Sequence, residues 1–185
     1  MAGRREVELA MRGDHDAFAA LAGASADRLF ALARMILRDA ERAEDATQEA
    51  LVKAWRDLPR LRDPDRFDAW MRRLVVNSCY DEARRTSRRA EVRMIPTAEP
   101  VGDDPGPSFA DRDRVDRGLR RIPVEQRAVL VLHHHHGLTH VEIAETLDIP
   151  LGTVKSRLRY ATEAMRAAIE ADERGTRHTA EGRSA

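Results

Sequence analysis

The segment from Gly137 to Met165 constrains the fold of this chain most strongly, because it combines a helix start, a helix stop and a second helix in one short stretch. Thr139 followed by Glu142 forms a capping box, in which each side chain satisfies an amide of the other residue at the start of a helix. Pro150 lacks an amide proton and disfavours helical geometry in the preceding residue, so the first helix is expected to end just before it. The segment therefore predicts a helix-turn-helix.

The second helix of this segment combines a narrow apolar stripe with an exposed face of small polar and basic residues. At helical spacing the stripe consists of Val154, Leu158, Ala161 and Met165. The positions expected to point away from it are Gly152, Thr153, Ser156, Arg159, Tyr160 and Glu163, with Lys155 and Arg157 on the flanks. Such a face suits the major groove of DNA. The alternative is an ordinary helical hairpin with a solvated face.

Composition favours a helical protein that is electrically neutral overall. Charged residues make up 35% of the chain and aromatic residues 4%, so the core must be built mainly from Leu, Ala, Val and Ile. The formal net charge is +0, so any affinity for nucleic acid must come from local basic patches or be lent by a partner. Cys79 is the single cysteine, and no segment resembles a membrane span or a signal peptide. We therefore expect a soluble cytoplasmic protein without membrane insertion.

The chain is expected to form two domains around a polar linker. Residues 94–112 are rich in proline, glycine and acidic residues, which is typical of a flexible linker. They separate one domain at 1–93, in which residues 1–13 are expected to form only a loose turn, from a second domain at 113–171. Residues 172–185 are polar and contain glycine, so we expect a disordered tail.

The helix expected between Asp39 and Pro59 has a clear inner and outer side. The residues predicted to face inward at helical spacing are Ala43, Ala46, Ala50, Leu51, Ala54, Trp55 and Leu58. The residues lying off that stripe are Asp45, Gln48, Glu49 and Val52. Composition alone does not distinguish a binding face from a solvated helix surface here.

A later helix, expected to begin near Phe67, is unusually rich in arginine. Its arginines are Arg72, Arg73, Arg84, Arg85, Arg88, Arg89 and Arg93. Such density can bind phosphate, and Phe67, Trp70 and Tyr80 are close enough in sequence to stack on bases. A solvated, arginine-rich helix end is an equally good interpretation of this segment by itself.

The run His133–His136, with His140 nearby, raises the question of a metal site. It has no neighbouring cysteine and no His-Glu-x-x-His spacing, and consecutive helical residues point in different directions. We expect partly exposed histidines at a helix end, where the helix dipole favours them, and no metal. No nucleophile with an adjacent base and no glycine-rich phosphate loop is present, so neither a cofactor nor an enzymatic activity is expected.

Two separated blocks resemble one known family. DAERAEDATQEALVKAW followed by FDAWMRRLVVNSCYDEARR resembles region 2 of bacterial sigma-70 family factors, and IPVEQRAVLVLHHHHGLTHVEIAETLDIPLGTVKSRL resembles their region 4. A short linker between the two blocks is typical of the extracytoplasmic-function (ECF) group. The resemblance implies an all-α protein of two small helical domains joined by a flexible linker. It also implies a sigma factor that binds core RNA polymerase and directs promoter recognition, DNA opening and transcription initiation.

The resemblance also implies roles for individual residues. Those matching the surface that docks on the polymerase β′ clamp are Asp45, Gln48, Glu49 and Val52. Those matching the surface that reads and opens the −10 element are Arg62, Phe67, Trp70, Arg73, Asn77, Tyr80, Arg84, Arg85 and Arg88. Those matching the helix that reads the −35 element are Thr153, Lys155, Ser156, Arg157 and Arg159.

Further partners follow from the same resemblance: the polymerase β flap, promoter DNA and an anti-sigma factor, with the free protein a monomer. The acidic linker would thread towards the RNA exit path. The chain departs from the family where Tyr160, Thr162 and Glu163 replace further basic residues, and the four histidines are not part of the family pattern. Two rival interpretations are a free-standing regulator, which would not bind polymerase, and a metal-dependent enzyme, which metal analysis would reveal.

Overall fold

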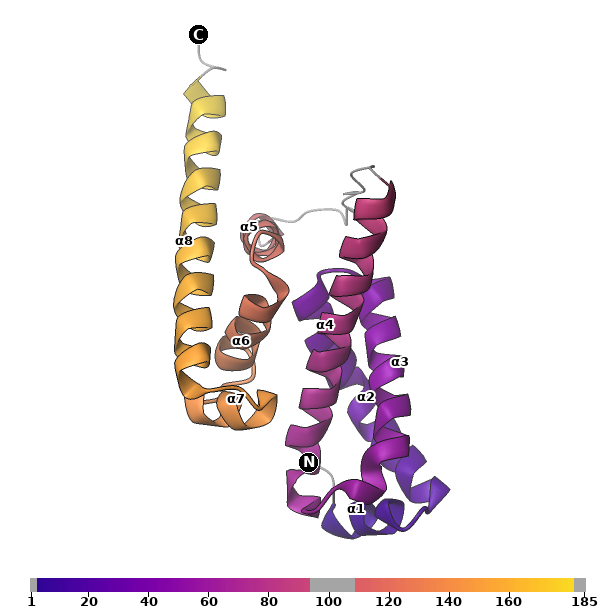
Figure 1. Ribbon diagram of the computed structural model, residues 1–185. Coiled ribbons are helices and arrows are strands. Elements are labelled where there is room, and N and C mark those ends of the chain that lie inside the picture. Colours follow the sequence, from indigo (N-terminus) through magenta and orange to yellow (C-terminus); the bar gives the residue numbers. More distant parts are fainter. Residues whose placement is uncertain (1–2, 94–108, 182–185) are drawn as a thin grey trace.

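The computed structural model describes residues 3–93 and 109–181, with side chains described for 3–89 and 115–171. All regular elements in these ranges are helical (Figure 1). The α-helices are α1 (Arg4–Met11), α2 (His15–Leu37), α3 (Ala40–Asp57), α4 (Phe67–Arg93), α5 (Phe109–Arg120), α6 (Val124–His134), α7 (His140–Leu147) and α8 (Leu151–Glu181). Two 3-10 turns, η1 (Leu58–Arg60) and η2 (Pro64–Arg66), connect α3 to α4. The expected all-α fold is confirmed, and none of these helices is long and apolar enough to cross a membrane.

The N-terminal domain is a bundle of α2, α3 and α4, with α1 packed across one end (Figure 1). Asp14 caps α2, because its carboxylate accepts a hydrogen bond from the Ala17 amide at 3.0 Å. The expectation of a loose first turn is wrong. Val7 and Ala10 lie three residues apart on one face of α1 and are each 1% exposed, so this short helix gains enough buried apolar surface to order the start of the chain.

Small side chains let α3 approach its neighbours closely. Ala43, Ala50 and Ala54 are completely buried between α3 and the helices it contacts, as the helical spacing predicts. Trp55 differs from the expectation because it lies at the edge of this stripe and keeps 36% of its surface exposed. Its ring packs against Phe18 of α2, with centroids 4.9 Å apart.

The C-terminal domain contains the predicted helix-turn-helix in α7 and α8. The capping box is present: the Glu142 amide donates to Thr139 Oγ1 at 3.2 Å, and the Thr139 amide donates to Glu142 Oε2 at 2.8 Å. Asp148 ends α7 in the left-handed conformation, with φ 54°, and Pro150 then precedes the first residue of α8. Val154 is completely buried, which fixes the start of α8 against the rest of the domain.

Two boundaries differ from the expected ones. Helix α5 begins at Phe109, inside the expected linker 94–112, and residues 94–108 lie outside the described part of the chain. Helix α8 continues to Glu181, so residues 172–181 are helical where a disordered tail was expected. That stretch continues a helix whose preceding turns are rich in alanine, and its glutamates and arginines have high helix propensity, so its single glycine, Gly175, does not end the helix.

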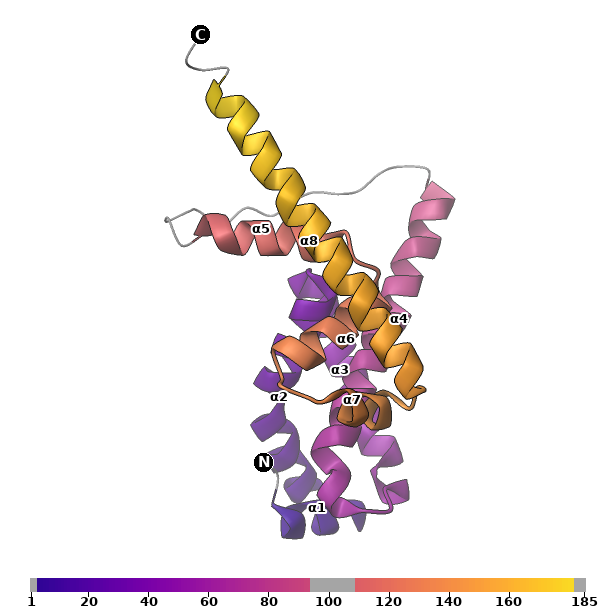
Figure 2. The same ribbon diagram turned by 90° about the vertical axis from the view of Figure 1, so that its left-hand side faces the viewer.

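The two domains pack against each other. Helix α6 contacts α2 and α4, and α7 contacts α4, so the C-terminal domain lies along one side of the bundle (Figures 1 and 2). The guanidinium of Arg127 in α6 bridges the domains, because it donates to the Ile36 carbonyl at the end of α2 and to the Ile122 carbonyl in its own domain. Burial lowers the pKa of Arg127 to about 10, which still leaves it a cation at neutral pH.

Candidate protein and nucleic-acid interfaces

The outer side of α3 carries an exposed surface, which we call the α3 face and define as Asp45, Gln48 and Val52. Val52 is 67% exposed, although it is an aliphatic residue on a helix whose alanines are buried. The amide of Gln48 donates to Glu44 Oε1 at 3.3 Å within the same helix, and none of the three residues packs into the core. The face thus combines acidic, amide and aliphatic groups that are open to a partner.

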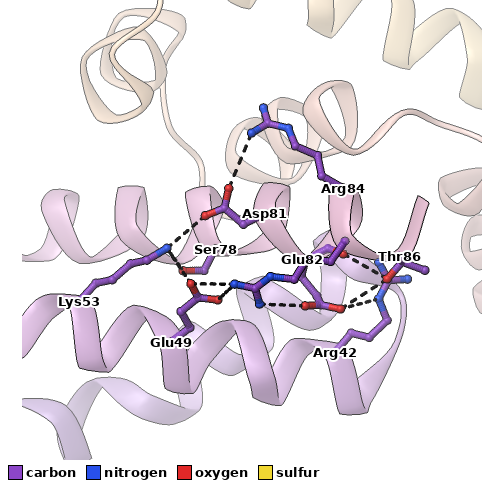
Figure 3. A network of polar contacts seen from close by, with 9 residues as sticks. Arg42, Glu49, Lys53, Ser78, Asp81, Glu82, Arg84 and Thr86 are labelled. Carbon is purple, nitrogen blue, oxygen red and sulfur yellow. Dashed lines mark hydrogen bonds and ion pairs between the residues drawn. The ribbon is translucent and has the colours of Figure 1, made fainter. Parts of the chain in front are cut away.

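Glu49 lies at the edge of the α3 face and belongs to a network between α3 and α4 (Figure 3). Its carboxylate pairs with Lys53 at 3.1 Å and with Arg85 at 3.0 Å. Lys53 also reaches Asp81 of α4 at 3.1 Å. Burial lowers the pKa of Lys53, but its hydrogen bonds and ion pairs with Glu49 and Asp81 outweigh this, so the pKa is raised. Glu49 therefore joins two helices, whereas its neighbours on the α3 face do not.

The same network engages two arginines that were assigned to DNA binding. Arg85 pairs with Glu49 and also with Glu82 at 3.4 Å, and Arg84 lies 3.7 Å from Asp81 (Figure 3). Both arginines are exposed, and both lie in the C-terminal half of α4. Their charges are therefore already partly compensated, and a DNA phosphate would compete with carboxylates for them.

The other candidates for −10 contacts differ in exposure. Arg62, Asn77 and Arg88 are exposed, and Trp70 is half-buried. Phe67 is 2% exposed and belongs to the core of the N-terminal domain. The expectation that Phe67 can stack on a nucleobase is therefore corrected. Phe67 is the first residue of α4, and its ring packs in the core of the helical bundle instead.

The C-terminal domain covers the middle of α4. Arg73 donates to Asp148 Oδ2, at the end of α7, at 2.9 Å. The Tyr80 hydroxyl is buried without a hydrogen-bond partner, and burial raises its pKa to about 12. The charges of Arg157 on α8 and Glu125 on α6 also act on this hydroxyl, which places both helices close to Tyr80. A residue assigned to the −10 surface thus lies near one assigned to the −35 surface.

The candidate −35 residues occupy the first turns of α8. Lys155 and Arg159 are exposed, whereas Thr153, Ser156 and Arg157 are half-buried. The Ser156 hydroxyl donates to the Thr153 carbonyl at 3.0 Å.

Arg159 is held along its own helix. Its guanidinium lies 4.5 Å from the centroid of the Tyr160 ring and 3.9 Å from Glu163 Oε1. Tyr160 and Glu163, two of the positions at which the chain departs from the family pattern, are therefore the residues that orient Arg159.

The histidines do not converge on one point. Among the described residues, no group of three or more His, Cys, Asp or Glu side chains is placed to hold a metal ion. His133 Nδ1 lies 2.8 Å from the Leu138 carbonyl, which ties the end of α6 to the turn before α7. His134 and His135 are exposed, whereas His136 faces the N-terminal domain.

Sequence reasoning missed Arg127, a buried residue that joins the two domains. The available signal was a single arginine next to the apolar run Ala128–Leu132. A charged residue that is buried beside such a run needs hydrogen-bond partners, so this position indicates a buried polar contact. The Ile122 carbonyl is near Arg127 in sequence, but the Ile36 carbonyl at the end of α2 is distant and gives no signal of its own.

Both domains match family models. Sigma-70 region 2 matches residues 21–89, which span α2 to α4, and sigma-70 region 4 matches residues 118–167, which include the helix-turn-helix. The ECF RNA polymerase sigma factor SigM of Mycobacterium tuberculosis is 35% identical over 149 residues, covering 80% of this chain and 75% of SigM. The ECF RNA polymerase sigma factor SigW of Bacillus subtilis is 26% identical over 176 residues, covering 88% of this chain and 94% of SigW.

Solved structures show the same arrangement of helices. CnrH in complex with the cytosolic domain of CnrY has a TM-score of 0.67 at 25% identity, covering 93% of this chain and 99% of that one. The sigma factor RpoE in complex with the anti-sigma factor NepR from Bartonella quintana has a TM-score of 0.68 at 22% identity, covering 84% of this chain and 98% of that one. The second likeness supports the shared fold alone.

A region 2 bundle followed by a region 4 helix-turn-helix defines a promoter-recognising transcription initiation factor. With ECF sigma factors as its relatives along most of its length, the chain belongs to the ECF group of the sigma-70 family.

Proposed function

We propose that this sigma factor docks on the β′ clamp of core RNA polymerase through the α3 face, together with Glu49 at its edge. The observation that carries this proposal is Val52, an aliphatic side chain 67% exposed on the same face of α3 as Asp45 and Gln48. An exposed aliphatic group among polar ones costs free energy in water, and a partner surface that covers it recovers that cost. Glu49 has a second role in this proposal, because it also braces α3 against α4.

The −10 element is read and opened by the outer surface of α4 and the loop before it. Arg62, Arg88 and Asn77 are exposed there, and arginines give phosphate affinity while an amide side chain can bond an extruded base. Trp70 and Tyr80 supply rings on which unstacked bases can rest. Arg73 and Tyr80 become fully available only after the C-terminal domain has moved away, because in the packed state Arg73 is paired with Asp148 and the Tyr80 hydroxyl is buried.

The −35 element is read by the first turns of α8, through Thr153, Lys155, Ser156, Arg157 and Arg159. In a helix-turn-helix, the N-terminal residues of the second helix contact base edges in the major groove. A protein with a formal net charge of +0 binds DNA poorly through two small patches that act separately. Held on a large enzyme, both patches act at high effective concentration.

The remaining partners follow from the same role. The C-terminal domain would rest on the β flap, and the linker 94–112 would run towards the RNA exit path. An anti-sigma factor would restrain the protein, which is otherwise a cytoplasmic monomer. The chain supplies binding groups and leaves the chemistry of RNA synthesis to the polymerase.

Co-purification with core polymerase, followed by run-off transcription on genomic fragments, tests this function. We expect a stable complex with core enzyme and transcripts that begin at discrete sites only when the protein is present. A free-standing regulator would bind DNA fragments without core enzyme and would add no new start sites. The matched control is the variant Asp45→Arg with Gln48→Ala, which keeps the C-terminal domain intact and should give neither complex nor transcripts.

A further inference from the structure

The four-histidine run is the sequence feature that the proposed function does not use. His133 is tied to the Leu138 carbonyl, and His134 and His135 are exposed. His136 is different because it lines a cavity of about 90 Å³ together with side chains from α2 and α4 of the other domain. This cavity therefore lies at the contact between the two domains, and His136 is the residue that the C-terminal domain contributes to it.

The cavity around His136 holds more positive than negative charge. Arg28 of α2 and Arg72 of α4 line it, against the single carboxylate of Asp68. Neither His136 Nε2 nor Arg72 Nε has a hydrogen-bond partner, and both atoms are buried. On its own segment the nearest titratable neighbour is His135, whose ring centroid lies 5.5 Å away.

From α7 the nearest acid is Glu142, whose charge is already engaged. Its pKa is lowered chiefly by the hydrogen bonds from Thr139, with a smaller contribution from Arg72. Asp68 is therefore the single acid among the residues that line the cavity, against the two arginines Arg28 and Arg72.

We propose that His136 is a pH-sensitive latch between the two domains. As a neutral imidazole, half-buried with its Nε2 atom inside the contact, it fits against α2 and α4. As an imidazolium it would bring a further positive charge into a cavity that already contains Arg28 and Arg72, and the domains would separate to hydrate it. Separation would uncover Tyr80 and release Arg73, so that lower pH would favour the state in which the surface of α4 is free.

The direction of the pH effect follows from linkage. Burial lowers the pKa of His136 in the packed state, and the charges of His135 and Arg72 lower it further. The separated state therefore binds the proton more tightly than the packed state. The packed state keeps its full stability above the ordinary histidine pKa of about 6.5 and loses it as the pH falls below that value. One linked proton changes the ratio of packed to separated molecules by at most about tenfold per pH unit.

Spin labels on the two domains can measure this separation directly. Glu41→Cys on α3 and Glu170→Cys on α8 provide exposed labelling sites, and the native Cys79 is completely buried, so it stays unlabelled. In the full chain we expect one distance population at pH 8 and a growing, longer population between pH 6.5 and 5.5. The measurement uses neither polymerase nor DNA, so its outcome is independent of the proposed function.

Three variants make the test specific. His136→Gln, which cannot be protonated, should keep a single short distance over this pH range, whereas His134→Gln, an exposed neighbour, should respond as the native chain does. Arg72→Gln removes one positive charge next to the ring and should move the opening to lower pH, which tests the latch without replacing the histidine. Equal pH responses of the native chain and His136→Gln, or an Arg72→Gln response identical to that of the native chain, would overturn the proposal.

Discussion

The α3 face and the middle of α4 both carry residues assigned to partner binding, but only the first is open. Asp45, Gln48 and Val52 have no packing role and project into solvent. On α4 of the same bundle, the Tyr80 hydroxyl is buried close to α6 and α8, and Arg73, although partly exposed, is paired with Asp148 of the C-terminal domain. If these surfaces bind as proposed, a partner can dock on the α3 face without any rearrangement, whereas DNA can contact Tyr80 only after the domains separate. This difference fits an order of events in which polymerase binds first and promoter DNA second.

The largest expected effect is the loss of polymerase binding on changing the α3 face. Asp45→Arg with Gln48→Ala should weaken association with core polymerase by 100-fold or more, roughly the cost of burying an unpaired, mismatched charge in an interface. Because neither residue packs into the core, the melting temperature should stay within about 1–2 °C of the native value. Affinity measured by fluorescence anisotropy and thermal melting by circular dichroism test the two parts separately.

The matched control is Asp27→Arg, which makes the same charge change at an exposed position of α2 away from the α3 face. It should bind polymerase as the native chain does. Unfolding of the double variant together with retained binding would show that the α3 face serves folding, and the comparison with α4 would lose its basis.

The second effect concerns the hydrogen bond of Arg127 that holds the C-terminal domain against the N-terminal bundle. Arg127→Met removes the donors to the Ile36 and Ile122 carbonyls and leaves both without these partners. Only the bond to Ile36 crosses between the domains, and one unsatisfied buried group costs about 1–3 kcal/mol, so the packed state should become about 5- to 150-fold less favourable relative to the separated one. The distance between labels on α3 and α8 at pH 8 should report a larger separated population. Arg121→Met, at an exposed position, should leave that population unchanged.

The helices were predictable because their patterns are local, whereas the domain contact was not. The capping box at Thr139 and the break at Pro150 specify the helix-turn-helix from a few adjacent residues. Helix α1 was missed because only Val7 and Ala10 signal its buried side, and two residues make a weak pattern. The partner of Arg127 in the other domain, the surroundings of Tyr80 and the cavity at His136 depend on residues far apart in sequence, so no local pattern could reveal these contacts.

The lack of a local signal for packing also explains why some candidate site residues have contacts in the fold that differ from the roles assigned to them from the sequence. Family resemblance assigned Glu49 and Arg85 to different partners, but the fold pairs them with each other at 3.0 Å. Phe67 was grouped with base-stacking residues because aromatic residues serve both cores and interfaces, and burial decides between these uses. Composition gives the type of a side chain, whereas only the packing shows whether it is free.

A third prediction separates the basic residues of α8. We expect Arg157 and Ser156 to contact base edges and Arg159 to contact phosphate. The contacts of Arg159 with Tyr160 and Glu163 direct it along its own helix and are compatible with a groove wall. A base contact is worth about 1–3 kcal/mol of discrimination, whereas a phosphate contact acts on all sequences alike.

Initiation by reconstituted polymerase on a library of −35 sequences, at two salt concentrations, measures both effects. Arg157→Ala should change which sequences are preferred, and Arg159→Ala should depress all of them and flatten the salt dependence. Glu163→Gln serves as a control, because it releases Arg159 without removing it and should leave the preferred sequences unchanged. A changed preference in Arg159→Ala alone would exchange the two roles.

The smallest expected effect tests whether Glu49 belongs with the open α3 face or with the covered surface of α4. Glu49→Gln removes the carboxylate that joins Lys53 and Arg85, whose pairs with it are partly exposed. Such pairs contribute about 0.2–1 kcal/mol each, so the melting temperature should fall by a few degrees at low salt and by less at high salt. Gln48→Ala, one residue away on the open face, should show no such salt-dependent loss, because its only described partner is Glu44 of the same helix. Equal melting curves for the two variants would assign Glu49 to docking alone, whereas a loss confined to Glu49→Gln would make it a brace between α3 and α4 that also borders the docking surface.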